Sequence, residues 1–163
     1  MNDIRIGQGF DVHAFTQGEF VTLGGVKIPH SRGVLAHSDG DVMLHALCDA
    51  LLGAAALGDI GMHFPDTDSK WRGADSRAFV RHVRELLRAQ KFVIVNVDVT
   101  VLAEAPRLGK HREAMRSNIA QDLELDVTRV NIKATTTEKL GLIGRGGGLA
   151  CQAIALIEKQ VTR

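Results

Sequence analysis

The sequence is poor in aromatic side chains and in cysteine. Its 163 residues include no tyrosine, one tryptophan and two cysteines. So few large aromatic rings argue against stacking on nucleic-acid bases as a mode of binding. Cys48 and Cys151 lie far apart and belong to no Cys-x-x-Cys pair, which favours reduced, packed thiols over a disulfide or a thiolate zinc site. Any metal site must therefore use nitrogen and oxygen ligands.

An excess of charge of either sign is also lacking. The 20 basic and 19 acidic residues are interspersed and give a formal net charge of +1. This balance predicts no nucleic-acid partner and no membrane partner, and indicates a small molecule or a protein instead. No apolar run approaches the ~20 residues of a membrane span, and the first residues resemble neither a signal peptide nor a transit peptide. We expect a cytoplasmic protein that forms a single domain over residues 1–163.

The first part of the chain predicts a strand, a hairpin and a helix. "DIRIGQGF" alternates as a strand does, and "EFVTLGGVKIP" predicts a β-hairpin that turns at Gly24 and Gly25. In "HSDGDVMLHALCDALLG", strong helix formers begin at Val42, and the spacing of Ser38 and Asp41 before them is that of a capping box. We therefore expect Ser38 to cap the start of this helix.

The second part predicts two more helices and three strands. Apolar residues recur at helical spacing over residues 75–90, which indicates an amphipathic helix. In "VNVDVTV", Val95 and the valines that follow it should share the buried face of a strand. A third helix should run from near Pro106 to about Leu125, and "RVNIKATTT" and "GLACQAIALIEK" predict two further strands. This order predicts an α+β fold in which one mixed or antiparallel sheet packs under about three helices.

The motif "GFDVHAF" contains two polar groups that could bind a metal ion. Asp11 and His13 are two positions apart, so an extended strand projects them side by side on one face. Their burial is costly unless something pairs with them. If His45 on the following helix faces this pair, the three nitrogen and oxygen ligands would suit a catalytic zinc site with one open position. Alternatively, His45 pairs with Asp41 one helical turn earlier and Asp11 only orients His13.

Two other segments have groups suited to phosphates. His37 and Ser38 precede the helix, where backbone N–H groups and the helix dipole favour an anion, although Ser38 could be only a cap and His37 a solvated residue. "ATTTEKLG", residues 134–141, offers three hydroxyls that could donate to phosphoryl oxygens, and Glu138 could hold a hard cation. The alternative is a strand end followed by an exposed pair of Glu138 and Lys139.

Taken together, these motifs resemble the 2-C-methyl-D-erythritol 2,4-cyclodiphosphate synthase family of the non-mevalonate isoprenoid pathway. The segments "GFDVHAF", "GGVKIP", "AHSDGDVMLHALCDALLGAAALGDIG", "FPDTD", "NVDVTVLAEAP", "NIKATTTEKLG" and "GRGGG" occur in family order along the chain. The resemblance implies an α+β subunit in a homotrimer with active sites at subunit boundaries. It also implies a phosphorus–oxygen lyase that converts 4-diphosphocytidyl-2-C-methyl-D-erythritol 2-phosphate to 2-C-methyl-D-erythritol 2,4-cyclodiphosphate and releases CMP.

The resemblance also implies roles for individual residues. Zinc, or another divalent transition metal, would be held by Asp11, His13 and His45. Glu138 would help to hold Mg²⁺ or Mn²⁺ at the substrate diphosphate, and the catalytic residues His37 and Thr136 would steady the transferring phosphoryl group. The implied substrate contacts are Asp11, His13, His37, Ser38, Asp59, Ile60, Gly61, Phe64, Pro65, Asp66, Thr67, Asp68, Ala103, Pro106, Arg107, Leu108, Gly109, Thr135, Thr136, Thr137, Glu138, Leu142 and Arg145. Those in 103–109 and 135–137 would enclose the cytidine from a neighbouring subunit.

Two other functions use the same residues. A zinc phosphohydrolase would activate water at the open metal position, so that water and not the substrate's own phosphate attacks. A non-enzymatic trimer would instead bind an isoprenoid diphosphate through Arg145 in the channel on its threefold axis. Near this channel the chain has Leu142 where family members often have an aromatic residue, and Gly147 where Glu is frequent.

Overall fold

A five-stranded mixed sheet is the frame of the molecule. The computed structural model describes residues 3–160. The strand order is β4 (Gly33–Val34), β1 (Ile4–Thr16), β7 (Gly148–Lys159), β5 (Phe92–Leu102) and β6 (Val130–Thr135). β7 runs antiparallel to β1 and β5, whereas β5 and β6 are parallel. The β2 (Phe20–Leu23) to β3 (Val26–Pro29) hairpin turns at Gly24 and Gly25, as predicted.

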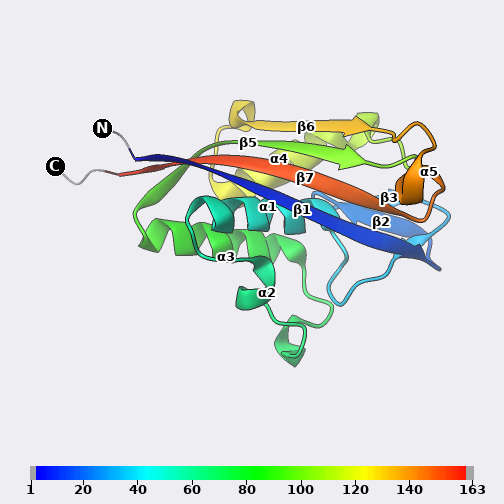
Figure 1. Cartoon of the computed structure of the whole chain (residues 1–163), viewed down its shortest axis with the longest axis horizontal. Coiled ribbons are helices and arrows are strands. Elements are labelled where there is room, and N and C mark those ends of the chain that lie inside the picture. The colour runs from blue at the N-terminus through cyan, green and yellow to red at the C-terminus, as the bar shows by residue number, and fades with distance from the viewer. Residues whose placement is uncertain (1–2, 161–163) are drawn as a thin grey trace.

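Three long helices pack with this sheet. Helix α1 (Val42–Ala54) packs directly on β1 and β7, α3 (Ser76–Ala89) packs on α1, and α4 (Arg112–Leu123) packs on α3 and β6. Figure 1 shows α1 between the strands and α3. This middle position explains why α1 is buried on nearly every side, while α3 buries a single apolar face. The mixed sheet and its helices confirm the predicted α+β class.

Short elements complete the chain. They are α2 (Ile60–His63), α5 (Gly141–Gly144) and three 3₁₀ turns at Ser69–Trp71, Gly109–His111 and Val127–Arg129. The third helix was predicted too early, since an irregular stretch and the second of these 3₁₀ segments follow Pro106 before α4 begins at Arg112. Val95 is only half-buried, because a β-bulge between Ile94 and Asn96 interrupts the alternation.

Two glycines on β1 bring α1 unusually close to the sheet. A Cβ at Gly7 would collide with the backbone carbonyl oxygen of Ala50, and one at Gly9 with that of Ala46. Only hydrogen at these positions lets the helix lie directly on the strand. The close approach brings the start of α1 next to the part of β1 that follows Gly9.

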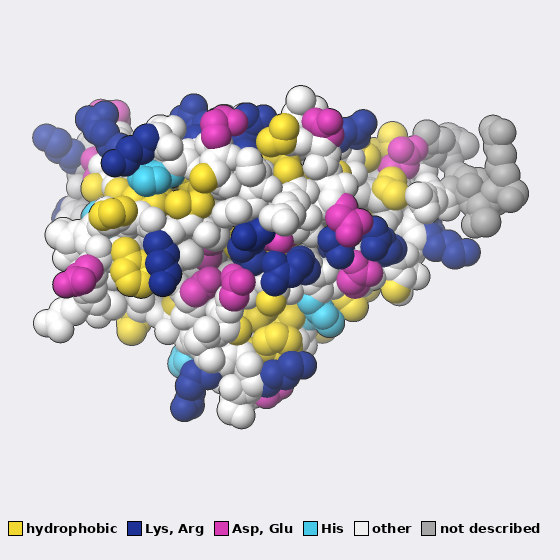
Figure 2. Space-filling model, turned by 180° about the vertical axis from the view of Figure 1, so that it is seen from behind, with side chains coloured by type: hydrophobic (Ala, Val, Ile, Leu, Met, Phe, Trp, Pro, Cys, Tyr) yellow, Lys and Arg dark blue, Asp and Glu magenta, His cyan; other side chains and the backbone are white. Residues whose placement is uncertain are grey.

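The outward face of β1 and β7 is apolar and exposed. Ile6, Phe10 and Val12 are 68%, 55% and 46% exposed, and Ile154 on β7 is 39% exposed. An apolar row of this kind is typical of a surface that is covered by another protein chain. By contrast, Figure 2 shows basic and acidic side chains interspersed over the rear of the molecule. Within residues 3–160, no helix has the length and apolar character needed to cross a membrane.

Candidate functional site

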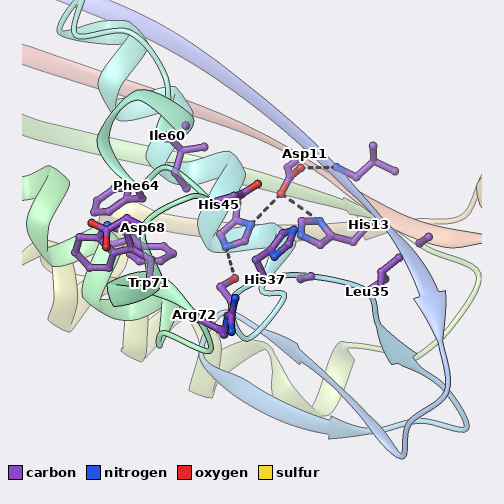
Figure 3. Close-up of a pocket in the computed structure, with 17 residues that line it drawn as sticks. Asp11, His13, Leu35, His37, His45, Ile60, Phe64, Asp68, Trp71 and Arg72 are labelled. Atoms are coloured by element: carbon purple, nitrogen blue, oxygen red, sulfur yellow. Dashed lines mark hydrogen bonds and ion pairs between the residues drawn. The ribbon is translucent and has the colours of Figure 1, made fainter.

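Asp11, His13 and His45 form a cluster that could hold a metal ion. The period of two along β1 puts Asp11 and His13 on the face covered by α1, and the helix supplies His45. Asp11 Oδ2 lies 3.2 Å from His13 Nδ1 and 3.1 Å from His45 Nδ1. One ligand atom from each residue lies within 4.8 Å of the other two. Figure 3 shows both imidazoles turned toward the carboxylate.

The state of His13 fits a metal ligand. Its Nδ1 is buried and makes no hydrogen bond, although the Asp11 carboxylate is near. Burial lowers the pKa of His13, and the neighbouring Asp11 opposes this shift only in part. A neutral imidazole with an unpartnered buried nitrogen is the form in which histidine binds divalent cations. The nitrogen and oxygen donors therefore suit zinc or a similar transition metal.

The alternative pairing of His45 with Asp41 does not occur. The Asp41 carboxylate is fully buried and accepts hydrogen bonds from the backbone N–H groups of Leu44, Gly24 and Gly25. Asp41 thus caps α1 and ties the β2–β3 hairpin to it. The His45 ring faces Asp11 on one side and the hydroxyls of Ser38 and Ser76 on the other.

The predicted cap at Ser38 is wrong. Helix α1 begins later than expected, at Val42, with Asp41 as its N-cap. The carboxylate of Asp41 accepts from Leu44 N–H, so Asp41 and not Ser38 satisfies this backbone donor at the helix N-terminus. Ser38 instead lies 3.1 Å from His45 Nε2 and accepts from Gly40 N–H. His37 and Ser38 still belong to the site, because both line the cavity beside the cluster.

A cavity of about 410 Å³ opens at the Asp11, His13 and His45 cluster. We call it the metal-side cavity. Predicted residues in its lining are Asp11, His13, His37, Ser38, His45, Ile60, Gly61, Phe64, Asp66 and Asp68. Asp59, Pro65 and Thr67 were also predicted but are not part of it. Asp59 caps α2 by accepting from Met62 N–H.

Several lining residues were missed by the sequence analysis. They include Leu35, Trp71, Arg72 and Phe79. The rings form a wall, because Phe64 stacks on Phe79 with centroids 4.4 Å apart and meets the edge of Trp71 at 5.0 Å. The single tryptophan of the chain, in a polar loop, was a signal that could have indicated this wall.

A second cavity, of about 690 Å³, lies where β5 and β6 end. We call it the strand-end cavity. Of the predicted substrate contacts, its lining contains Ala103, Pro106, Arg107, Leu108, Gly109, Thr135 and Thr136. It shares no lining residue with the metal-side cavity. Glu104, Lys110 and Ala134 also line it but were not among the predicted contacts.

Besides Asp59, Pro65 and Thr67, four predicted contacts line neither of these two cavities. They are Thr137, Glu138, Leu142 and Arg145. Glu138 accepts a hydrogen bond of 3.2 Å from the hydroxyl of Thr136, and Thr137 N–H donates to Glu104. Leu142 is 57% exposed, on α5. Within one chain, the structure therefore separates Glu138 and Thr136 from the metal-capable cluster.

The fold and the site define a class of protein: an α+β protein with three side chains that could hold a metal ion on the wall of a cavity. The chain belongs to the YgbB family, whose model matches residues 4–158. A curated protein of Azotobacter vinelandii named 2-C-methyl-D-erythritol 2,4-cyclodiphosphate synthase is 62% identical over 94% of this chain and 98% of its own length. One of the same name from Marinobacter nauticus is 60% identical over 95% of this chain and 98% of its own length.

Solved structures share the fold. The bifunctional IspDF of Campylobacter jejuni matches 98% of this chain at 46% identity with a TM-score of 0.94. The match spans only 43% of that longer chain. IspF of Plasmodium falciparum, in a CDP complex, matches 99% of both chains at 37% identity with a TM-score of 0.86. The resemblance seen in the sequence motifs is thereby confirmed over nearly the whole length.

Proposed function

We propose that this chain is a synthase that closes the cyclic diphosphate of 2-C-methyl-D-erythritol and releases CMP. The substrate is 4-diphosphocytidyl-2-C-methyl-D-erythritol 2-phosphate, and the reaction class is that of a phosphorus–oxygen lyase. The observation that carries the proposal is the Asp11, His13 and His45 cluster on a cavity wall in a chain 62% identical to a curated synthase of this name. The relatives do not favour the two alternatives, a phosphohydrolase and a binding-only trimer.

Asp11, His13 and His45 are the proposed zinc ligands. When bound there, zinc or a similar divalent ion supplies Lewis-acid stabilisation of charge on a phosphoryl oxygen. Two observations support this assignment. The Nδ1 atom of His13 has no hydrogen-bond partner, and both imidazoles approach the same carboxylate oxygen of Asp11. Glu138 is the proposed contact for Mg²⁺ or Mn²⁺ at the diphosphate, and its exposed carboxylate, which accepts from the Thr136 hydroxyl, lies in the segment after β6.

The residues of the chain act mainly by positioning. The substrate's own 2-phosphate is the nucleophile, so no covalent enzyme nucleophile is needed, and holding the flexible chain in line can supply about 7 kcal/mol or more. His37 and Ser38 would donate to phosphate oxygens in the metal-side cavity, and Thr136 would donate from the strand-end cavity. The strand-end cavity suits the cytidine, and the CDP complex of the Plasmodium falciparum relative supports a cytidine-nucleotide ligand.

A homotrimer would bring the two cavities together. They share no lining residue, and we propose that one site forms from the metal-side cavity of one subunit and the strand-end cavity of another. The exposed apolar row of Ile6, Phe10, Val12 and Ile154 offers a surface for assembly.

Sedimentation should give three times the chain mass of 17.6 kDa. Ile6→Glu should shift this toward the monomer, while Val127→Glu, at an exposed site outside the row, should not.

The remaining proposals rest on the sequence. We propose that residues 1–163 form one cyclodiphosphate synthase domain in the cytoplasm, with no nucleic-acid or membrane partner. Arg145, together with the exposed Leu142, is the proposed contact for an isoprenoid diphosphate on the threefold axis.

A phosphorus NMR time course in ¹⁸O-labelled water tests the reaction. The metal-free protein is incubated with the cytidine diphosphate substrate, and zinc and magnesium are added back in turn. Cyclisation predicts CMP and a cyclic diphosphate without label, because no water enters the product. Label in the phosphate products would identify a hydrolase, and no CMP at any metal composition would contradict an enzymatic function.

A further inference from the structure

The side of His45 that faces away from the metal ligands contacts a buried hydroxyl. His45 Nε2 lies 2.9 Å from Ser76 Oγ, and Ser76, the first residue of α3, is fully buried. Ser76 Oγ in turn donates to Asp39 Oδ1. The opposite ring nitrogen, Nδ1, faces Asp11 Oδ2 at 3.1 Å. A chain of contacts thus runs from Asp39 through Ser76 to the imidazole.

The direction of these hydrogen bonds fixes the proton on the ring. A serine hydroxyl has a single proton to donate, and Ser76 gives it to a carboxylate that can only accept. Toward His45, Ser76 Oγ can therefore only accept, so this contact of 2.9 Å needs a hydrogen on Nε2, which the Ser38 hydroxyl at 3.1 Å can also accept. In the neutral ring this leaves the lone pair on Nδ1. Nδ1 and the Asp11 carboxylate, 3.1 Å apart, are then both acceptors, so a cation and not a hydrogen bond would satisfy the two together.

Asp39 is itself held in place by the backbone. Its Oδ2 accepts from Ser76 N–H at 3.1 Å, and its Oδ1 accepts from Asp41 N–H at 3.2 Å. Its own N–H donates to Ala74 O at 3.2 Å. These bonds join the loop before α1 to the start of α3, so the carboxylate cannot turn away from the hydroxyl without breaking several contacts.

We propose that Ser76 and Asp39 are positioning residues that hold His45 as its Nε2-protonated tautomer, with Nδ1 free to bind the metal ion. The inference rests on the proposed metal role of Asp11, His13 and His45. Hydrogen bonds to the second nitrogen of a ligating histidine fix its ring and change metal affinity by about 10-fold to 100-fold. Here the acceptor at Nε2 is the Ser76 hydroxyl, whose own proton is directed to the Asp39 carboxylate.

Two variants test whether these residues set the His45 tautomer or only support helix α3. Ser76→Ala removes the nearer of the two hydroxyls at Nε2 and leaves Ser38 Oγ at 3.1 Å. Asp39→Asn keeps the size of the side chain. If the amide oxygen of Asn accepts from Ser76 N–H, as Asp39 does, its NH₂ group faces Ser76 Oγ and donates to it. The Ser76 hydroxyl then no longer donates to residue 39, and its proton can turn toward His45. The matched control is Asp75→Ala, which removes the side-chain cap of α3 without touching His45. Ser76→Thr keeps the hydroxyl and should restore binding.

The experiment measures zinc affinity of the metal-free full-length proteins by competition with a chromophoric chelator, and the His45 tautomer by ¹⁵N NMR. Ser76→Ala and Asp39→Asn should each weaken zinc binding about 10-fold and raise the Nδ1–H population, while Asp75→Ala should change the affinity less than about twofold. Melting curves of the metal-free proteins verify that each variant is folded. Equal weakening by Asp75→Ala, or unchanged tautomer and affinity in both site variants, would overturn the inference and leave the metal site standing. If the wild-type protein binds no zinc, the proposed metal role of Asp11, His13 and His45 is wrong, and the inference that rests on it is wrong as well.

Discussion

At the scale of single residues, His45 connects the metal-capable cluster to the rest of the fold. We expect His45→Ala to lower the rate of CMP release more than about 100-fold, because the variant removes one of the three proposed zinc ligands. The ring borders a cavity, so the free energy of unfolding of the metal-free protein should fall by only about 1–3 kcal/mol. Zinc content, CMP release and a thermal melt check these points together.

His63→Ala is the matched control for this variant. The His63 ring bonds to Leu57 O and is not part of the metal-side cavity. The control should therefore keep its zinc and its rate of CMP release. Global unfolding of His45→Ala would show instead that the metal is structural.

The sequence predicts the residues of the metal-capable cluster better than their surroundings. Strand alternation alone puts Asp11 and His13 on one face, and this prediction is confirmed. The role of Ser76 could not be predicted, because it depends on α3 starting beside a loop 37 residues earlier in the chain. Ser38 was assigned as a cap because its spacing is right, but Asp41 occupies the cap position with three backbone donors.

At the scale of elements, the contact between β1 and α1 determines where His45 lies. Gly9→Ala should lower the free energy of unfolding by at least about 1–3 kcal/mol, since its methyl group would collide with Ala46 backbone atoms next to His45. It should also weaken zinc binding by moving the helix. Gly53→Ala on the exposed side of α1 would meet only the backbone oxygen of Gln8, at an ordinary van der Waals distance of 3.9 Å, and should stabilise the protein by about 0.5–1 kcal/mol. Urea unfolding measures the free energy of unfolding of both variants. A value for Gly9→Ala equal to that of the wild type would contradict this account.

The buried cap of α1 should make stability depend on pH. Burial raises the pKa of Asp41 from 3.8 to about 7, although three backbone N–H groups oppose the shift. Between these values the folded state holds a proton that the unfolded chain has released, so the free energy of unfolding should fall as pH rises through this window. The fall should reach at most about 4 kcal/mol.

Asp41→Asn cannot titrate and serves as the reference for this effect. The stability of the wild type relative to Asp41→Asn should be larger at about pH 5 than at about pH 8. Urea titrations at both pH values measure the difference. A difference that stays constant or grows with pH would show that the three backbone donors keep Asp41 ionised in the folded state.

At the scale of the whole molecule, the sequence predicts the sheet and helices but not how a complete site is formed. The α+β class follows from local periodicity, and the structure confirms it. The separation of Thr136 and Glu138 from the metal-side cavity depends on long-range packing that no local pattern encodes. Their proposed meeting across subunits came from the resemblance to the family, and it has a direct test.

Mixing two inactive variants should restore activity if each site uses two subunits. His45→Ala damages the metal-side cavity, and Thr136→Ala damages the strand-end cavity, so each variant keeps the half that the other lacks. After the two are unfolded and refolded together in equal amounts, random assembly gives both intact halves at roughly one quarter of the subunit boundaries. CMP release should therefore recover to roughly a quarter of the wild-type rate per chain. Each variant refolded alone is the control, and a mixture no more active than these controls would place the whole site within one chain.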